Sequence, residues 1–138
     1  MTIVDPLGRI LTEIRDFPAV AAITSRIRGE EMAQGDKPPL VIIRSFPTAR
    51  LANAQRVPLL RHGYVILCFG TSPKQATTLA LAVAEAAHNL DPRTNASGVA
   101  IYQSLHGTIG GMETDPDTSW PFRSVFPSAI ASTMAVTP

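Results

Sequence analysis

The sequence predicts an α+β fold with a mixed, mostly antiparallel sheet of four to five strands and two main helices packed on it. A capped helical segment occupies residues 5–17, and an apolar run at 64–69 leads directly into an alanine-rich helix at 73–90. Two alternating segments, 98–109 and 124–136, then follow with no helix between them. Strands that neighbour strands, without a regular strand–helix–strand repeat, indicate an antiparallel sheet with helices on it.

The first helix is predicted from its start signal and its apolar spacing. Asp5 is a typical helix N-cap, and Pro6 suits the first helical position. One face of the segment is apolar at helical spacing, through Leu7, Ile10, Leu11, Ile14 and Phe17. Pro18 interrupts this helix, and the following AVAAITS predicts a short second turn.

The segments before the central strand are shorter. Residues 25–31, SRIRGEE, fit either a short strand or a connector, and both interpretations stay open. Residues 32–39 contain Gly35, Asp36 and two prolines, which predict a loop. Residues 40–46, LVIIRSF, are β-branched and apolar and predict a strand.

The segment 47–61, PTARLANAQRVPLLR, has no clear period. We expect it to be a loop, and loops of this length inside a small domain are often functional. It carries Arg50, Arg56 and Arg61 and no acid.

The central strand and the main helix are predicted together. Continuous apolar sequence from Tyr64 to Phe69 is typical of a central strand covered on both faces. Ser72 is the expected N-cap of the helix, and Gln75 completes a capping box. The helix runs to Leu90, with an apolar stripe at Ala76, Leu79, Ala80, Val83, Ala87 and Leu90.

The last third of the chain predicts two strands and a loop. Residues 98–109, GVAIYQSLHGTI, and residues 124–136, SVFPSAIASTMAV, alternate well enough to be strands. Between them, residues 110–121, GGMETDPDTSWP, are rich in turn residues and predict a loop.

Length and composition limit the class of protein. We expect 138 residues to form one domain, residues 1–138, long enough to bury an ordinary core. With 45% hydrophobic and 17% charged residues, the chain is expected to be globular and to cover part of its surface in an assembly. We expect neither a transmembrane helix nor a signal peptide, and one cysteine agrees with synthesis in a reducing cytoplasm.

Charge is distributed unevenly along the chain. Residues 1–36 carry four arginines and six acids, a net charge of −2. Residues 37–74 carry six basic residues and no acid, and residues 75–138 carry two arginines and five acids, which gives +6 and −3. Two interpretations stay open: scattered surface charge, or a basic middle that meets acidic neighbouring subunits or nucleic acid.

The candidate catalytic groups have ordinary structural explanations. Cys68 lies inside an apolar strand, whereas a reactive thiol needs a positive and partly exposed setting. The turn at 70–74 lacks the second glycine and the Gly-Lys-Ser/Thr ending of a phosphate loop. Ser72 is better explained as the helix cap, and the paired acids Glu30 and Glu31 sit in an expected solvated connector. We therefore predict no catalytic residue and no cofactor.

Metal and nucleic-acid sites are not predicted either. His62, His88 and His106 do not stand at zinc-ligand spacing. The DPDTSW segment, residues 115–120, fits a capped turn better than a calcium loop. The arginines of 47–61 are not interleaved with aromatic residues, as a single-strand binding platform requires.

Several phrases of the chain, in this order, resemble the tail-terminator family of long-tailed bacteriophages, also called tail-completion or minor tail protein U-like. The phrases are DPLGRILTEIRDF, RIRGE before PPLVIIRSF, GYVILCFGTSPKQATTLALAVAEAAHNL, and the closing FRSVFPSAIASTMAV. In that family a strand of this kind leads through a short turn into an alanine-rich helix. The GGMETDPDTSWP excursion is a departure from simpler members of that family.

The resemblance implies a virion protein, made in the host cytoplasm, that forms a ring, usually a hexamer, on the end of the tail tube. Such a ring stops tube polymerisation and joins the tail to the head-completion or neck proteins. It implies contacts with other copies of the chain, with the tail tube protein and with a neck protein, and a passage for DNA. For this chain we predict Arg44, Arg50, Arg56 and Arg61 as residues of the assembly interface or the lumen.

Two other functions stay open. A head-closure, or neck connector, protein belongs to the same virion, but its fold is richer in β-barrel, and the capped helix at 73–90 argues against it. A small cytoplasmic α+β enzyme or ligand-binding domain would need a polar pocket, and no motif in the sequence supplies one.

Overall fold

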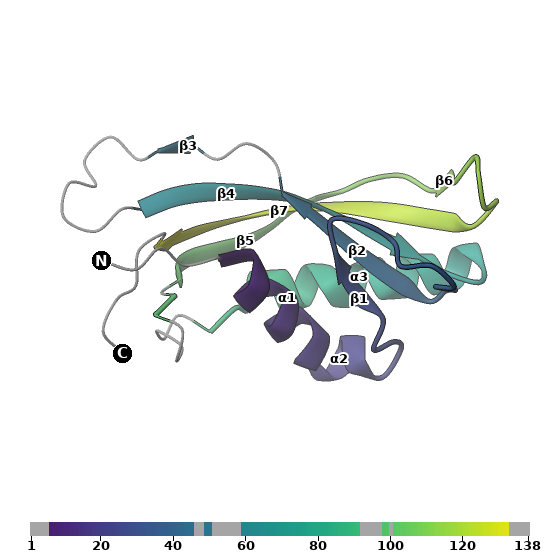
Figure 1. Cartoon of the computed structure of the whole chain (residues 1–138), viewed down its shortest axis with the longest axis horizontal. Coiled ribbons are helices and arrows are strands. Elements are labelled where there is room, and N and C mark those ends of the chain that lie inside the picture. Colours follow the sequence, from purple (N-terminus) through teal and green to yellow (C-terminus); the bar gives the residue numbers. More distant parts are fainter. Residues whose placement is uncertain (1–5, 46–48, 51–58, 92–97, 100, 133–138) are drawn as a thin grey trace.

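The computed structural model describes residues 6–45, 49–50, 59–91, 98–99 and 101–132. Along the chain the elements are α1 (Pro6–Asp16), α2 (Pro18–Ala21), β1 (Ile27–Gly29), β2 (Leu40–Ser45), β3 (Ala49–Arg50), β4 (Leu59–Phe69), α3 (Pro73–His88), β5 (Ile101–Ile109), β6 (Glu113–Thr114) and β7 (Pro121–Ser132). The predicted α+β class is confirmed, because the helices pack on one face of a mostly antiparallel sheet (Figure 1).

The sheet has the strand order β1–β2–β4–β7–β5. β1 runs parallel to β2, and the other neighbours along this order are antiparallel. β7, late in the chain, lies between β4 and β5 and therefore joins the two halves of the sheet. β3 and β6 are short additions that pair with β4 and β7.

We call the face of the sheet that carries the helices the inner face. Tyr64, Ile66 and Cys68 of β4 point to it and are at most 2% exposed. They pack in one cluster with α1 and with the apolar stripe of α3, which includes Leu79 and Val83. Alternate residues of a strand point to opposite faces, so the next residues along β4 point outward.

Among the described residues, those that cover the outer face of the sheet gather at one end of it. Its cluster consists of three buried residues, Leu40, Ile42 and Phe69, and four partly buried ones, Met32, Leu67, Trp120 and Phe122. The Phe69 ring lies 6.1 Å from the Trp120 ring, in an edge-to-face arrangement. The prediction of a central strand covered on both faces is thus confirmed at the Phe69 end, while Val65, further along the outer face, is only half-buried.

The N-terminal helices agree with the expected apolar stripe. Ile10 and Ile14 of α1 are buried, and Leu7, Leu11 and Phe17 pack against the same cluster. Pro18 ends α1 and begins α2, as the sequence predicts. Asp5, the expected cap, lies outside the described residues.

Arg9 is a buried cation that the apolar spacing did not predict, and it is 7% exposed. Its Nε donates to Glu13 at 2.7 Å, and its Nη atoms donate to the carbonyls of Val99 and Asp91. Glu13 in turn accepts from the Asp91 amide at 2.8 Å. The first helix is therefore tied to the chain just after α3 and just before β5.

Two predicted loops contain short strands. In the segment 47–61, Ala49 and Arg50 pair with Arg61 and Leu60. β4 begins at Leu59, which pairs with Ser132 of β7, and this is earlier than predicted. The prediction of an unpaired loop is wrong at these residues, while 51–58 lie outside the described residues.

The C-terminal loop is likewise shorter than predicted. β6 pairs with Phe122 and Pro121, so residues 110–121 form a hairpin whose second strand begins at Pro121. Of the two interpretations of 25–31, the strand is confirmed by β1. The main helix ends at His88, two residues before the predicted end.

Candidate functional site

The junction between β4 and α3 is a tightly packed helix start. Ser72 Oγ accepts from the Gln75 amide at 3.2 Å, which confirms Ser72 as the N-cap. Gln75 Oε1 accepts from the Thr71 amide at 2.7 Å. The second hydrogen bond of the capping box is therefore donated by Thr71, the residue before the N-cap. A Cβ on Gly70 would lie 2.4 Å from the Ala76 nitrogen, so this position has room for glycine alone.

Cys68 is enclosed in the inner cluster, with 0% exposure. Burial raises the pKa of its thiol, because the charged thiolate is disfavoured away from water. The predicted core role of Cys68 is confirmed, and its setting is the opposite of a nucleophile's.

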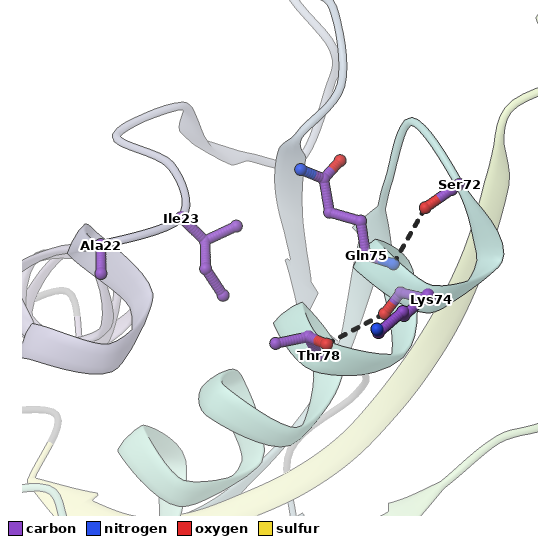
Figure 2. A pocket seen from close by; sticks show the side chains of 6 residues that line it. All are labelled: Ala22, Ile23, Ser72, Lys74, Gln75 and Thr78. Atoms are coloured by element: carbon purple, nitrogen blue, oxygen red, sulfur yellow. Dashed lines mark hydrogen bonds between the residues drawn. The ribbon is translucent and has the colours of Figure 1, made fainter.

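A shallow pocket of about 400 Å³ lies beside the start of α3. Figure 2 shows Ala22 and Ile23 across the pocket from the first turns of the helix. The hydroxyl of Thr78 donates to the carbonyl of Lys74, and Ser72 holds its cap, so these hydroxyls are already engaged in the helix. Lys74 supplies the charge at this pocket, and no general base faces it among the six lining residues.

The DPDTSW segment is a capped turn, as predicted. Asp115 Oδ2 accepts from the amide and hydroxyl of Thr118, at 2.9 and 2.6 Å. These hydrogen bonds hold the pKa of Asp115 below its ordinary value. The Asp115 carboxylate therefore stabilises the turn at the tip of the β6–β7 hairpin.

A second ordered carboxylate fixes the loop before β2. Asp36 accepts from Arg28 at 3.1 and 3.2 Å and from the Ala33 amide at 2.7 Å. Its side chain is 5% exposed, whereas that of Arg28 is 40% exposed. The hydrogen bond from Arg28 is the main cause that lowers the pKa of Asp36. This loop carries Met32 onto the outer cluster.

The structure places the four predicted assembly arginines unequally. Arg44, on β2, is exposed, and its Nε donates to the Glu30 carbonyl at 3.0 Å. The backbones of Arg50 and Arg61 lie in the β3–β4 ladder, and Arg56 lies outside the described residues. The ladder brings Arg50 and Arg61 to one end of the sheet, away from Arg44.

Surface apolar residues are the feature that the sequence did not reveal. Leu81 on α3, Leu105 on β5 and Phe126 on β7 are 56%, 46% and 41% exposed. The alternation of 98–109 and 124–136 predicted that half of those residues point away from the core, and it did not tell which face the helices cover.

The described residues contain no group of three or more His, Cys, Asp or Glu side chains placed to hold a metal ion. Within the same part of the chain, no helix combines the length and hydropathy that a membrane span requires.

Comparison with known proteins identifies the fold. No protein-family model matches the sequence, and no curated protein does. A solved structure described as "Virion of native gene transfer agent (GTA) particle" contains a chain with a TM-score of 0.68 and 12% identity. The match covers 92% of this chain and 94% of that chain. The similarity therefore extends over nearly the whole of both chains, and at this identity it establishes a shared fold.

Proposed function

We propose that this chain is a structural protein of a phage-like virion. The observation that carries the proposal is the fold shared with a chain of the gene transfer agent virion over 92% of this chain. A match of that extent means that the shared fold includes nearly the whole of this chain. The groups that first suggested chemistry also have structural roles here, because Cys68 fills the core and Ser72 caps α3.

Within the virion, the proposed role is that of a tail terminator. Copies of the chain form a ring, of hexamer size by resemblance, that ends tube polymerisation and contacts the tail tube protein below and a neck protein above. The 16-residue helix α3 lies along one face of an open sheet, which differs from the barrel-rich fold expected of a head-closure protein. This arrangement favours the terminator over the neck connector.

Arg44, Arg50, Arg56 and Arg61 are the proposed contact residues of this ring. Arginine suits such a place because its planar group pairs with carboxylates or DNA phosphates in several geometries. Arg44 offers an exposed guanidinium on β2, and Arg50 and Arg61 share the β3–β4 ladder.

Particle assembly tests the role directly. In particles made without this protein, electron microscopy is expected to show overlong tubes or tails that do not join heads. Normal tails and normal joining would rule out the terminator role, while absence of the protein from wild-type particles would rule out any virion role.

Charge reversal tests the arginines separately. Arg50→Glu, Arg56→Glu and Arg61→Glu together should leave circular dichroism and melting nearly unchanged, because contact residues of a ring are expected to face solvent in the single subunit, and exposed charges contribute little to stability. The same triple variant should fail to cap tails. As a matched pair, Arg50→Glu with Arg61→Glu is compared with Arg15→Glu and Lys37→Glu, which changes the net charge equally and should cap normally. Normal particles from the triple variant would show that segment 47–61 is not a contact surface of the ring.

A further inference from the structure

The outer face of the sheet has an apolar patch that none of the described helices covers. Val65, Leu105 and Phe126 form it, and we call it the outer patch. Ile66 pairs with Val125, which places Val65 beside Phe126 on the outer face, and Leu105 pairs with Ser128 on the neighbouring strand. Phe126 is 41% exposed and Leu105 46%. Apolar side chains gathered on one sheet face are typical of an interaction surface.

The opposite side of the molecule has a complementary feature on α3. The exposed stripe of this helix contains Lys74, Thr78, Leu81, Glu85 and His88, at the spacing of one helix face. Leu81, in the middle of the stripe, is 56% exposed and has the largest exposure among the big apolar side chains described. Along the helix, the stripe therefore has basic Lys74 first, apolar Leu81 in the middle and acidic Glu85 after it.

The outer sheet face shows the same order with opposite charges. Glu113 of β6 pairs with Phe122, whose side chain belongs to the outer cluster, so Glu113 lies on the outer face. Arg44 pairs with Val65 and lies beyond the other side of the outer patch. The path from Glu113 through Phe126 and Val65 to Arg44 therefore runs from an acidic residue through apolar ones to a basic one.

The two surfaces also agree in length. Lys74 and Glu85 are eleven positions apart, or about 16 Å along a helix, with Leu81 between them. Glu113 and Arg44 are separated by four residues along the strands and three strand spacings, or about 20 Å. Phe126 is level with Arg44 along the strands and lies one strand from Glu113 and two strands from Arg44. Long lysine, arginine and glutamate side chains span the difference.

We propose that α3 of a second copy of this chain covers the outer patch. In this contact Leu81 of one copy packs among Val65, Leu105 and Phe126 of the next. Lys74 then lies opposite Glu113, and Glu85 opposite Arg44. The inference rests on the proposed ring and names the two surfaces that would close it.

The geometry fixes the kind of symmetry. Figure 1 shows α3 on one face of the sheet, and the outer patch belongs to the opposite face. One pair of copies therefore cannot satisfy both surfaces of each copy at once. Each copy instead offers α3 to one neighbour and its sheet to another. Such a heterologous contact repeats from copy to copy and produces a ring where the rotation closes.

Intermolecular disulfide formation tests this contact. Protein with Leu81→Cys is mixed with protein with Phe126→Cys and oxidised, both at high concentration and in purified particles. The mixture is expected to yield a cross-linked dimer that neither single variant yields alone, and a chain with both substitutions is expected to yield a ladder of larger species. Cys68 stays silent because it is buried. Ala21→Cys mixed with Phe126→Cys is the control, since Ala21 is exposed on α2 and does not belong to the stripe.

A charge swap tests the contact where a cysteine variant folds poorly. Arg44→Glu or Glu85→Arg alone should weaken self-association about tenfold, and the two together should restore it. If the protein forms oligomers but shows neither the cross-link between positions 81 and 126 nor restored association in the double charge variant, this interface is wrong. The proposed ring would not be contradicted by that result. A cross-link of the outer patch to the tube protein in particles, with none between copies, would assign the patch to that partner instead. A chain that stays monomeric at every concentration and is absent from particles would overturn the ring itself.

Discussion

The two faces of β4 differ although their residues alternate along one apolar run. On the inner face, Tyr64, Ile66 and Cys68 are at most 2% exposed under the helices. On the outer face, Phe69 is buried under the aromatic rings of the β6–β7 hairpin and its base, while Val65 remains half-buried. A continuous apolar strand therefore indicates that both of its faces are buried in the assembled protein. It does not indicate whether the same chain supplies the residues that bury both faces.

The largest contrast is expected between neighbouring residues of β4. Ile66→Ala should lower the free energy of unfolding by about 3 kcal/mol, because it leaves a cavity in the closed inner cluster. Val65→Ala should lower it by about 1 kcal/mol or less, because its side chain is only half-buried. Denaturant unfolding of the two variants measures this difference. Equal losses would mean that the two faces are packed alike.

The thiol at Cys68 sharpens the same contrast. Cys68→Ala should cost about 1–2 kcal/mol for the small cavity it leaves and should leave tail joining intact. In the folded wild-type protein the thiol should react slowly with a labelling reagent, whereas Val65→Cys in the Cys68→Ala background should react much faster. Rapid labelling of native Cys68, with loss of function in its alanine variant, would contradict a core role.

A change at the N-cap of α3 tests how this helix is held on the inner face. Ser72→Ala should lower stability by about 1 kcal/mol, because the Gln75 amide loses its acceptor at the helix start. Ser128→Ala, a matched change on the outer face of β7, should have a smaller effect. Thermal melting compares the two variants. A Ser72→Ala protein of full stability that had lost a measurable chemical activity would point to catalysis instead.

The smallest effect is expected at the outer cover, where Asp36 fixes the loop that carries Met32. The folded-state pKa of Asp36 is lowered, so its stabilisation is present above the unfolded-state pKa of about 3.9 and is lost as pH falls through the folded value. The wild type should therefore melt at a higher temperature than Asp36→Asn at about pH 6, and the gap should close toward about pH 2. A gap that did not depend on pH would show that the ion pair with Arg28 is not its source.

The elements that the sequence predicted well are those with local signals. Ser72 with Pro73 starts α3, and the β-branched run at 40–46 becomes β2, because capping and strand preference act within a few residues. The strands that it missed depend on partners outside their own short segments. β3 and β6 are two residues long and pair where β4 extends past β2 and where β7 extends past β5.

Arg9 illustrates the same limit in the core. An arginine beside an apolar stripe is usually a surface residue. Its carbonyl partners, Asp91 and Val99, lie 82 and 90 positions further along the chain. No local pattern contains that information. The assembly surface shows the same limit. The sequence predicted the basic segment 47–61, whereas the outer patch could be identified only from the strand register, which brings Val65, Leu105 and Phe126 to one region of the outer face.

The position of β7 has a consequence for synthesis on the ribosome. Its neighbours β4 and β5 are translated before it, and they join one sheet only through the strand Pro121–Ser132. Until that strand emerges, the nascent chain holds two separate sheet edges and no completed inner layer. The folding transition is therefore expected only after β7 has been translated, and its contacts are long-range, which favours slow folding. Before β7 emerges, the chain lacks the completed sheet and is not expected to join other copies through it.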